Sequence, residues 1–246
     1  MPFTFSHPAL ILPLQKYFGK WFSLTGLVVG SMVPDFEYFL QLRTRRSFSH
    51  AMPGVFYFDL PLAFLLTFIF HGIVRNSLFD NLPAFFKRRF LQYKSFDWPA
   101  YFKKNWFIIF LSILIGIASH LLWDDFTHIH GYFVHMIPFL KRNLIIGDFQ
   151  IPYYRIFQHL SSLLGGLIVF FAIYQLPEKE IKSTKINFNY WLFIALISSM
   201  FLLLEFGIGI HQHVVWHIVV STISGAMLGS ILFPFLNYKS RKSITG

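Results

Sequence analysis

The sequence predicts an all-α, polytopic membrane protein with about five transmembrane helices and an N-terminal re-entrant or interfacial helical hairpin. Hydrophobic residues make up 55% of the 246 residues, and the mean hydropathy is +0.54. Charged residues make up 13%, whereas a soluble domain has about 25%. The 33 phenylalanines suit helices that face lipid. Together these values exclude an ordinary soluble domain.

Cysteine content and net charge narrow the function classes. The chain has no cysteine, which excludes disulfide bonds and thiolate metal sites, so a metal would have to be held by His, Asp and Glu. The net charge of +10 indicates basic cytoplasmic loops and attraction to membrane lipid rather than binding to nucleic acid. The start, MPFTFSHPALILP, lacks the basic region of a signal peptide, so we expect it to stay in the mature protein.

The expected elements follow from runs of apolar residues, since about 17–25 such residues cross a bilayer. Residues 8–33 are apolar but contain Pro13, Lys16, Gly19 and Lys20, which predicts two short helices rather than one span. Five later segments are long enough, or nearly so, to cross the membrane: 54–74, 106–123, 160–176, 190–210 and 214–236.

The distribution of Lys and Arg predicts the orientation. If the five segments cross alternately, thirteen basic residues lie in 75–105, 177–189 and 237–246, and six in 34–53 and 124–159. The positive-inside rule puts the first group in the cytoplasm. We therefore expect a multi-pass membrane protein with the second group of segments on the periplasmic or external face.

The whole chain is expected to form one integral membrane domain. Within it, residues 1–176 carry the candidate metal site, and residues 177–246 form a C-terminal helical pair. Ten of the eleven histidines can share the non-cytoplasmic layer under this topology, and His71 alone lies toward the cytoplasm. Ionisable groups at membrane depth are costly and indicate function.

The stretch SHLLWDDFTHIHG, residues 119–131, is the centre of this layer. His120 and Asp124 are four residues apart, so on a helix they lie on one face with Cβ atoms about 6 Å apart. His128 continues the row if the helix persists. This spacing is typical of metal ligands on a helix; the alternative is a polar helix end among lipid headgroups. Asp125 is a candidate proton acceptor.

Two segments before the first span add further candidates. Pro34 ends the preceding apolar segment and presents Asp35 as a ligand, while Glu37 is a candidate ligand or general base. His50 follows Arg43, Arg45 and Arg46. Arginine binds phosphate or carboxylate through two parallel hydrogen bonds, so these arginines are candidates for substrate binding; the alternative is contact with headgroups.

The remaining ionisable residues are weaker candidates. His7 joins the layer if the N-terminal hairpin returns to the same side, and His159 opens the third span from that side. Asp59 and Glu205 are candidates for orienting a histidine or for polar contacts between helices. The other histidines are expected to lie at the membrane interface: His130, His135, His211, His213 and His217.

Three motifs carry a family resemblance: MPFTFSHPA, GSMVPDFEYF and SHLLWDDFTHIHG. In this order they resemble an uncharacterised family of bacterial membrane proteins, over the chain to about residue 175. More distantly, the pattern is similar to predicted membrane-bound metal-dependent hydrolases. Those have an N-terminal His, then PDxDH, HRGxTHS, and HxxxD followed by Thr and Gly. The matching positions here are Asp35, Arg46, His50, His120, Asp124, Thr127 and Gly131.

The chain departs from the hydrolase pattern at three positions, where it has Glu37, Tyr38 and Arg45. These replacements leave open whether a two-metal site has become a one-metal site or has lost activity. The order His, Asp, His, His-x3-Asp also resembles the zinc-dependent bacterial phospholipases C. These resemblances imply a protein of the bacterial inner (cytoplasmic) membrane that binds one or two divalent ions, most readily zinc, through His7, Asp35, His50, His120 and Asp124. The spacing of His128 and the position of His159 add these two residues as candidate ligands.

Two functions fit these features. One is a membrane-embedded, metal-dependent hydrolase that acts on phosphoesters of lipids or lipid-linked molecules, with membrane lipid as its partner. The other is a transporter or membrane-assembly protein that uses the same polar layer as a path or a structural metal site. Transporters often contain internal repeats, and no repeat is evident in the sequence, which favours the hydrolase.

Overall fold

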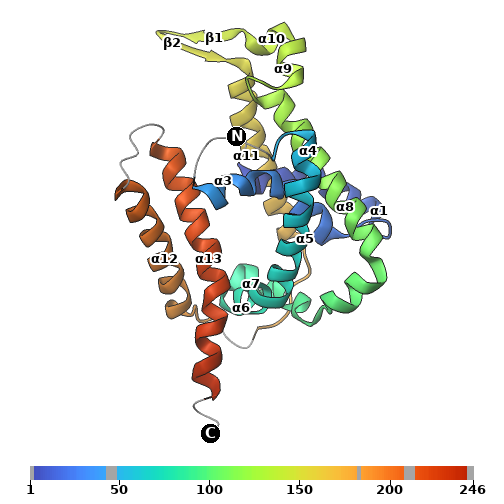
Figure 1. Ribbon diagram of the computed structural model, residues 1–246, viewed down its shortest axis with the longest axis vertical. Coiled ribbons are helices and arrows are strands. Elements are labelled where there is room, and N and C mark those ends of the chain that lie inside the picture. The colour runs from blue at the N-terminus through green and yellow to red at the C-terminus, as the bar shows by residue number, and fades with distance from the viewer. Residues whose placement is uncertain (1–2, 43–48, 182–183, 208–213, 243–246) are drawn as a thin grey trace. The chain divides into compact units, whose positions relative to one another are not determined.

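Helices dominate the computed structural model of the chain, which describes residues 3–42, 49–181, 184–207 and 214–242 (Figure 1). Five helical runs are long and apolar enough to cross a membrane, which confirms the predicted all-α polytopic class. They are Met52–Asn81, Trp98–Met136, Tyr153–Tyr174, Phe188–Gly207 and Val214–Leu236.

The chain groups into two compact units that alternate along the sequence. Unit 1 comprises Met1–Asp35, Phe48–Phe64 and Phe102–Gln175. Unit 2 comprises Phe36–Ser47, Leu65–Tyr101 and Leu176–Gly246.

Unit 1 begins with the predicted N-terminal helical segment. It contains a 3-10 helix and two short α-helices, η1 (Thr4–Leu10), α1 (Leu12–Phe18) and α2 (Leu24–Met32), followed by the 3-10 turn η2 (Val33–Asp35). The Ser23 hydroxyl accepts the N–H of Gly26 and caps α2, as serine commonly does at a helix start.

The first span starts in unit 1 as α4 (Met52–Gly54) and the π-helical turn η3 (Val55–Asp59), and continues as α5 (Leu60–Ile69). Pro61 has no N–H to donate to the preceding turn, which accounts for the irregular hydrogen bonding just before it. Asp59, in this turn, is fully buried.

Helix α8 (Trp98–Thr127) contains the predicted second span. Its backbone leaves the helical region at Asn105, with φ −125° and ψ 23°, one residue before the predicted start of the span at residue 106. The helix then continues through His120 and Asp124 to Thr127, so these two residues of the predicted row lie on a regular helix. His128 follows the end of the helix. Helix α11 (Tyr153–Tyr174) is the third span and starts seven residues earlier than predicted.

Between α8 and α11 lie two short helices, α9 (Tyr132–Met136) and α10 (Pro138–Lys141), and a hairpin of β1 (Asn143–Ile146) and β2 (Phe149–Pro152) (Figure 1). The strands are antiparallel with Ile146 opposite Phe149. The two-residue turn uses Gly147 at φ +58°, a conformation that costs glycine little. The apolar runs of the sequence predict only a connection between two spans here, not a hairpin.

Unit 2 contains α3 (Phe36–Gln41), the π-helical turn η4 (Phe70–Val74), α6 (Arg75–Asn81), α7 (Ala84–Phe90) and the 3-10 helix η5 (Leu91–Ser95). It also contains α12 (Phe188–Gly207) and α13 (Val214–Lys242), which lie side by side (Figure 1).

Tyr190, Ile194 and Phe233 form the apolar contact between α12 and α13. The Trp191 indole N–H donates to the Asn81 carbonyl at 2.8 Å and joins α12 to α6.

Candidate metal centre

Five ligand-type side chains of unit 1 converge on one buried place. They come from η1, η2, the turn just before α4 and the last turns of α8, and they are His7, Asp35, His50, His120 and Asp124. Two sets of three, His7–Asp35–His120 and His50–His120–Asp124, each offer three ligand atoms within 4.8 Å of one another. His120 belongs to both sets.

The distances between these atoms are longer than hydrogen bonds and close to those between ligands of one ion. His50 Nε2 lies 3.3 Å from Asp124 Oδ2. His120 Nε2 lies 3.6 Å from Asp35 Oδ1 and 3.8 Å from Asp124 Oδ2. Ligands about 2.0–2.1 Å from a tetrahedral zinc ion are separated by about 3.3 Å. The spacing therefore suits a common ion with only small side-chain movements.

The ring of His120 is oriented by the backbone of α2. Its Nδ1 lies 2.8 Å from the carbonyl oxygen of Ser31; since a carbonyl only accepts, Nδ1 carries the proton. The lone pair is then on Nε2, which faces Asp35 and Asp124 and makes no hydrogen bond to any described residue. Metal-binding histidines commonly have this outer hydrogen bond.

Glycines allow α2 and α8 to approach closely enough for this contact. A Cβ placed on Gly30 would lie 2.3 Å from the Ile113 carbonyl oxygen, and one on Gly116 would lie 2.4 Å from the Leu27 carbonyl oxygen. Small residues commonly permit such backbone contact between membrane helices. The close approach brings Ser31 to the level of His120.

The 3-10 helix that carries His7 is attached to α11. Ser6 Oγ donates to the Ser162 carbonyl at 2.7 Å, and the Phe3 N–H donates to Ser162 Oγ at 2.9 Å. A Cβ on Gly165 would lie 2.9 Å from Ser6, so the small residues of the sequence HLSSLLGG serve close packing. This attachment holds His7 against α8, where its ring stacks on His120 with a centroid distance of 3.8 Å.

Burial shifts the pKa values of His7 and Asp35. Burial, followed by the neighbouring His120, lowers the pKa of His7 well below its ordinary value, so His7 is neutral and able to ligate. Burial raises the pKa of Asp35, while His120 and a hydrogen bond from Thr4 oppose that rise. Thr4 Oγ1 donates to Asp35 Oδ2 at 2.7 Å, which leaves Oδ1 toward the histidines.

Two predicted ligands lie outside these two sets. His128 is adjacent to them: its Nδ1 lies 3.5 Å from Asp124 Oδ1 and 3.0 Å from the Asp124 carbonyl oxygen. His159 is exposed on α11 and forms no hydrogen bond or ion pair with any residue that the structure describes. His159 as a ligand stays a prediction.

The two predicted proton acceptors, Asp125 and Glu37, lie outside the two sets of candidate ligands. Asp125 Oδ1 accepts the N–H of Tyr132 at 3.2 Å, so that carboxylate is used at the start of α9. Glu37 is buried in unit 2 and accepts from Gln41 Nε2 at 3.0 Å. Arg43, Arg45 and Arg46 lie outside the described residues, and so do His211 and His213.

A family model described as a domain of unknown function, DUF4184, matches residues 1–235. The chain belongs to the DUF4184 family. This confirms the expectation of an uncharacterised family. No curated protein and no solved structure matches this DUF4184 chain.

Two groups that contact the candidate ligands of this DUF4184 protein were not predicted from the sequence. Thr4 binds Asp35, and the Ser31 carbonyl binds His120. Thr4 stands three residues before His7, within the opening motif, which is a signal that was available. The role of Ser31 is a backbone contact, which no side-chain pattern reveals.

Proposed function

We propose that this protein is a membrane-embedded, metal-dependent hydrolase that acts on phosphoesters of lipids or lipid-linked molecules. One observation carries the proposal: the buried convergence of His7, Asp35, His50, His120 and Asp124, with ligand atoms at the spacing of a metal site. Buried carboxylates and imidazoles are costly unless they are paired or bind a metal. Among described residues, Asp35 contacts no lysine or arginine that would neutralise it.

Zinc is the metal that best suits this donor set. Three imidazoles and two carboxylates are ligands that zinc accepts. Because the single lone pair of His120 Nε2 can bind only one ion, the two sets of three indicate one ion with up to five candidate ligands. A bound zinc ion would lower the pKa of a water molecule toward about 7 and stabilise charge on phosphoryl oxygens.

His128 is suited to move a proton beside such a site. Its Nδ1–H donates to the Asp124 carbonyl, so the lone pair is on Nε2. Its side chain is 18% exposed, whereas that of Asp124 is 5% exposed, so His128 lies at the edge of the cluster. In phosphoester hydrolysis, water oxygen bonds to phosphorus and the bond from phosphorus to the alcohol oxygen breaks. We assign to His128 the uptake of the water proton, which then passes to the alcohol.

A cavity of about 480 Å³ next to this edge suits a lipid headgroup. It is lined by Ile129 and His130, which directly follow His128, and by His135, Lys141 and Tyr154. Lys141 Nζ donates to His135 Nδ1 at 2.7 Å. The lining of the cavity therefore carries a positive charge. A phosphate diester headgroup would be attracted there. The expected external side of this segment suits an amphipathic substrate that enters from the outer leaflet.

Metal analysis of the purified protein tests the proposal first. We expect about one zinc per chain after purification without chelators, and loss of most of it in His120→Ala. His130→Ala is the matched control for zinc content alone, because His130 is exposed and outside both ligand sets but lines the cavity proposed for the headgroup. Release of water-soluble phosphate or headgroup from a panel of phospholipids then measures activity.

The outcomes separate three cases. Metal content near zero in undamaged protein contradicts the metal site and the hydrolase together. Bound metal with phosphoesterase activity that disappears in His120→Ala supports the hydrolase. Bound metal without activity on any lipid phosphoester favours a structural metal site, as expected for a transporter or assembly protein.

A further inference from the structure

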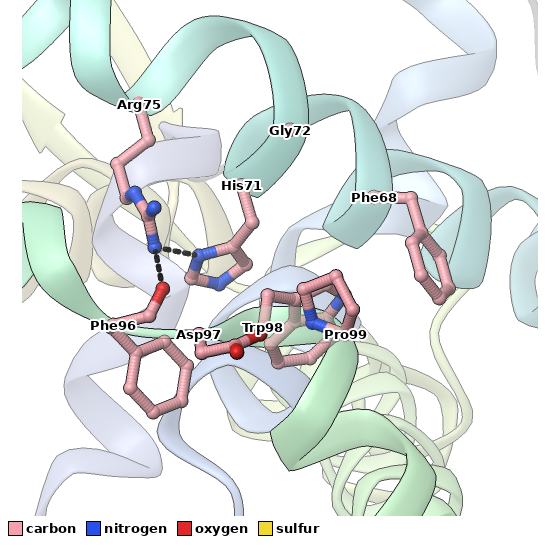
Figure 2. A pocket seen from close by; sticks show the side chains of 8 residues that line it. All are labelled: Phe68, His71, Gly72, Arg75, Phe96, Asp97, Trp98 and Pro99. Atoms are coloured by element: carbon pink, nitrogen blue, oxygen red, sulfur yellow. Dashed lines mark hydrogen bonds between the residues drawn. The ribbon is translucent and has the colours of Figure 1, made fainter.

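A second polar site lies in unit 2, apart from the residues of the candidate metal centre. It is a cavity of about 200 Å³ between the turn η4, the start of α6 and the segment that leads into α8 (Figure 2). His71 and Arg75 enter it from one side, and Phe96, Asp97 and Trp98 line the other. His71 is the one histidine expected to lie toward the cytoplasm.

Arg75 is a buried cation without a carboxylate partner. Only 7% of the residue is exposed. Its Nη1 donates to the Phe96 carbonyl at 2.6 Å and to His71 Nδ1 at 3.1 Å, and its Nε donates to Asn76 Oδ1 at 3.2 Å (Figure 2). The two N–H groups of Nη2 have no acceptor among the described residues. An uncompensated buried charge is costly, and a bound anion would remove that cost.

His71 fixes the guanidinium of Arg75 in the cavity. Because a guanidinium only donates, His71 Nδ1 accepts from Arg75 Nη1. The imidazole is held flat against Trp98, with a centroid distance of 4.4 Å and an interplanar angle of 7°. The stacked ring therefore holds the donors of Arg75 in a fixed position.

The backbone keeps room for a ligand beside these donors. Gly72 also lines the cavity, and a Cβ added to it would meet no atom within 4 Å. The turn is π-helical, with the Arg75 N–H bonded to the Phe70 carbonyl; such turns are frequent at functional sites. Drug-sized ligands occupy pockets of about 300–1,000 Å³, so this cavity suits a small group.

We propose that this cavity binds a phosphate group through Arg75, which His71 holds in place. Arginine binds phosphate oxygens through paired hydrogen bonds. Asp97 also lines the cavity, but its Oδ1 accepts the N–H of Ala100 at the start of α8 and it does not pair with Arg75. Phe68, Phe96 and Trp98 form the apolar part of the lining, which suits the glycerol and acyl portion of a phospholipid.

The surrounding sequence favours a site at the cytoplasmic membrane surface. The segment 75–105 carries seven Lys and Arg residues and is predicted to be cytoplasmic. Basic pockets between membrane helices on that side commonly bind phospholipid headgroups. Inorganic phosphate or a soluble phosphate ester has the same chemistry, so the experiment must distinguish these sources.

The test uses full-length protein in neutral detergent after treatment with EDTA, so that phosphate cannot bind through a metal. Binding of phosphatidylglycerol is measured by native mass spectrometry, and binding of inorganic phosphate by calorimetry. Arg75→Gln removes the charge. Gly72→Leu fills the cavity where there is space for a side chain, and therefore keeps the fold. Arg88→Gln is the matched control, since Arg88 is exposed and pairs with Glu178.

We expect wild type to bind phosphatidylglycerol, with inorganic phosphate competing. Affinity should fall about tenfold to a hundredfold in Arg75→Gln and in Gly72→Leu, and stay within about twofold in Arg88→Gln. Binding of inorganic phosphate alone, with the same pattern in the variants, also supports the site and assigns it to a soluble phosphate. No binding to wild type, or equal binding by Gly72→Leu and wild type, overturns the proposal. Neither result depends on the metal centre.

Discussion

The Nδ1–H of His120 donates to the carbonyl oxygen of Ser31 at 2.8 Å, and this contact directs Nε2 of His120 toward Asp35 and Asp124. The donor and acceptor are 89 residues apart in sequence. The bond selects one tautomer and one ring orientation before any metal binds. Because Nε2 belongs to both sets of candidate ligands, the whole centre depends on it.

Removing His120 and removing His128 should have different effects. We expect His120→Ala to weaken zinc binding by about a hundredfold or more, because it removes the shared ligand. His128→Ala should keep near-normal zinc content and lose phosphoesterase activity by about 10²–10⁴-fold, because it removes a proton acceptor. Competition with a chromogenic chelator measures affinity. Equal loss of zinc in both variants would show that His128 is a ligand.

Thr4 should affect the metal without touching it. Thr4→Val keeps the shape but removes the hydrogen bond from Oγ1 to Asp35 Oδ2. Loss of such outer contacts typically costs about 10–100-fold in metal affinity, and we expect this range. Thr4→Ser keeps the hydroxyl and should bind zinc like wild type. If both variants bind equally, the hydroxyl does not position Asp35.

Gly116 should be intolerant of even one methyl group. Alanine at this position would place a Cβ 2.4 Å from the Leu27 carbonyl oxygen, which would push α2 away from α8 and move Ser31 from His120. We expect a loss of stability of about 1–3 kcal/mol, a lower melting temperature and reduced zinc content.

Gly166→Ala is the control for this substitution. It lies on α11, and its added Cβ would meet only Ser6 Oγ at 3.6 Å, an ordinary contact. We expect its melting temperature to equal or exceed that of wild type, since alanine favours helix over glycine. A Gly116→Ala protein as stable as Gly166→Ala would contradict the close packing of α2 and α8.

Zinc binding should release protons at mildly acidic pH. The raised pKa of Asp35 means that without metal this carboxyl keeps its proton to a higher pH than usual, and zinc must displace it. The lowered pKa of His7 means that His7 stays neutral as the pH falls below 6.5. Zinc affinity should therefore decrease with falling pH as Asp35 takes up its proton.

Calorimetry in buffers of different ionisation enthalpy measures this proton release. Asp35→Asn should bind zinc more weakly and release fewer protons, because the asparagine has no carboxyl proton to lose. Proton release that is unchanged in Asp35→Asn would mean that another group carries the proton.

The orientation in the membrane is tested by reporter fusions. Alkaline phosphatase is active only outside the cytoplasm, so we expect activity for a fusion after residue 145 and none after residue 90. The reason is the excess of Lys and Arg in the segments predicted to be cytoplasmic. Activity at 90 and its absence at 145 would reverse the assignment of the sides.

Local patterns in the sequence were sufficient for the helices and for part of the centre. Apolar runs predict all five spans, because lipid requires the backbone to satisfy its hydrogen bonds within each helix. The spacing of His120 and Asp124 predicts one helical face because helix geometry is regular. The ends of the spans were less accurate, since polar residues such as those of 75–81 continue a helix beyond its apolar part.

Local sequence patterns do not predict which distant segments come together in the fold. His7 meets His120 because glycines and serines join η1, α2, α8 and α11 by contacts between backbones, and such contacts have no side-chain periodicity. Asp125 has the same charge as Asp124 and is its neighbour in sequence, yet it bonds to Tyr132 instead of lying in the cluster. Residue type and spacing identify candidates for ligation. Helix rotation and close packing decide which of these candidates face one another.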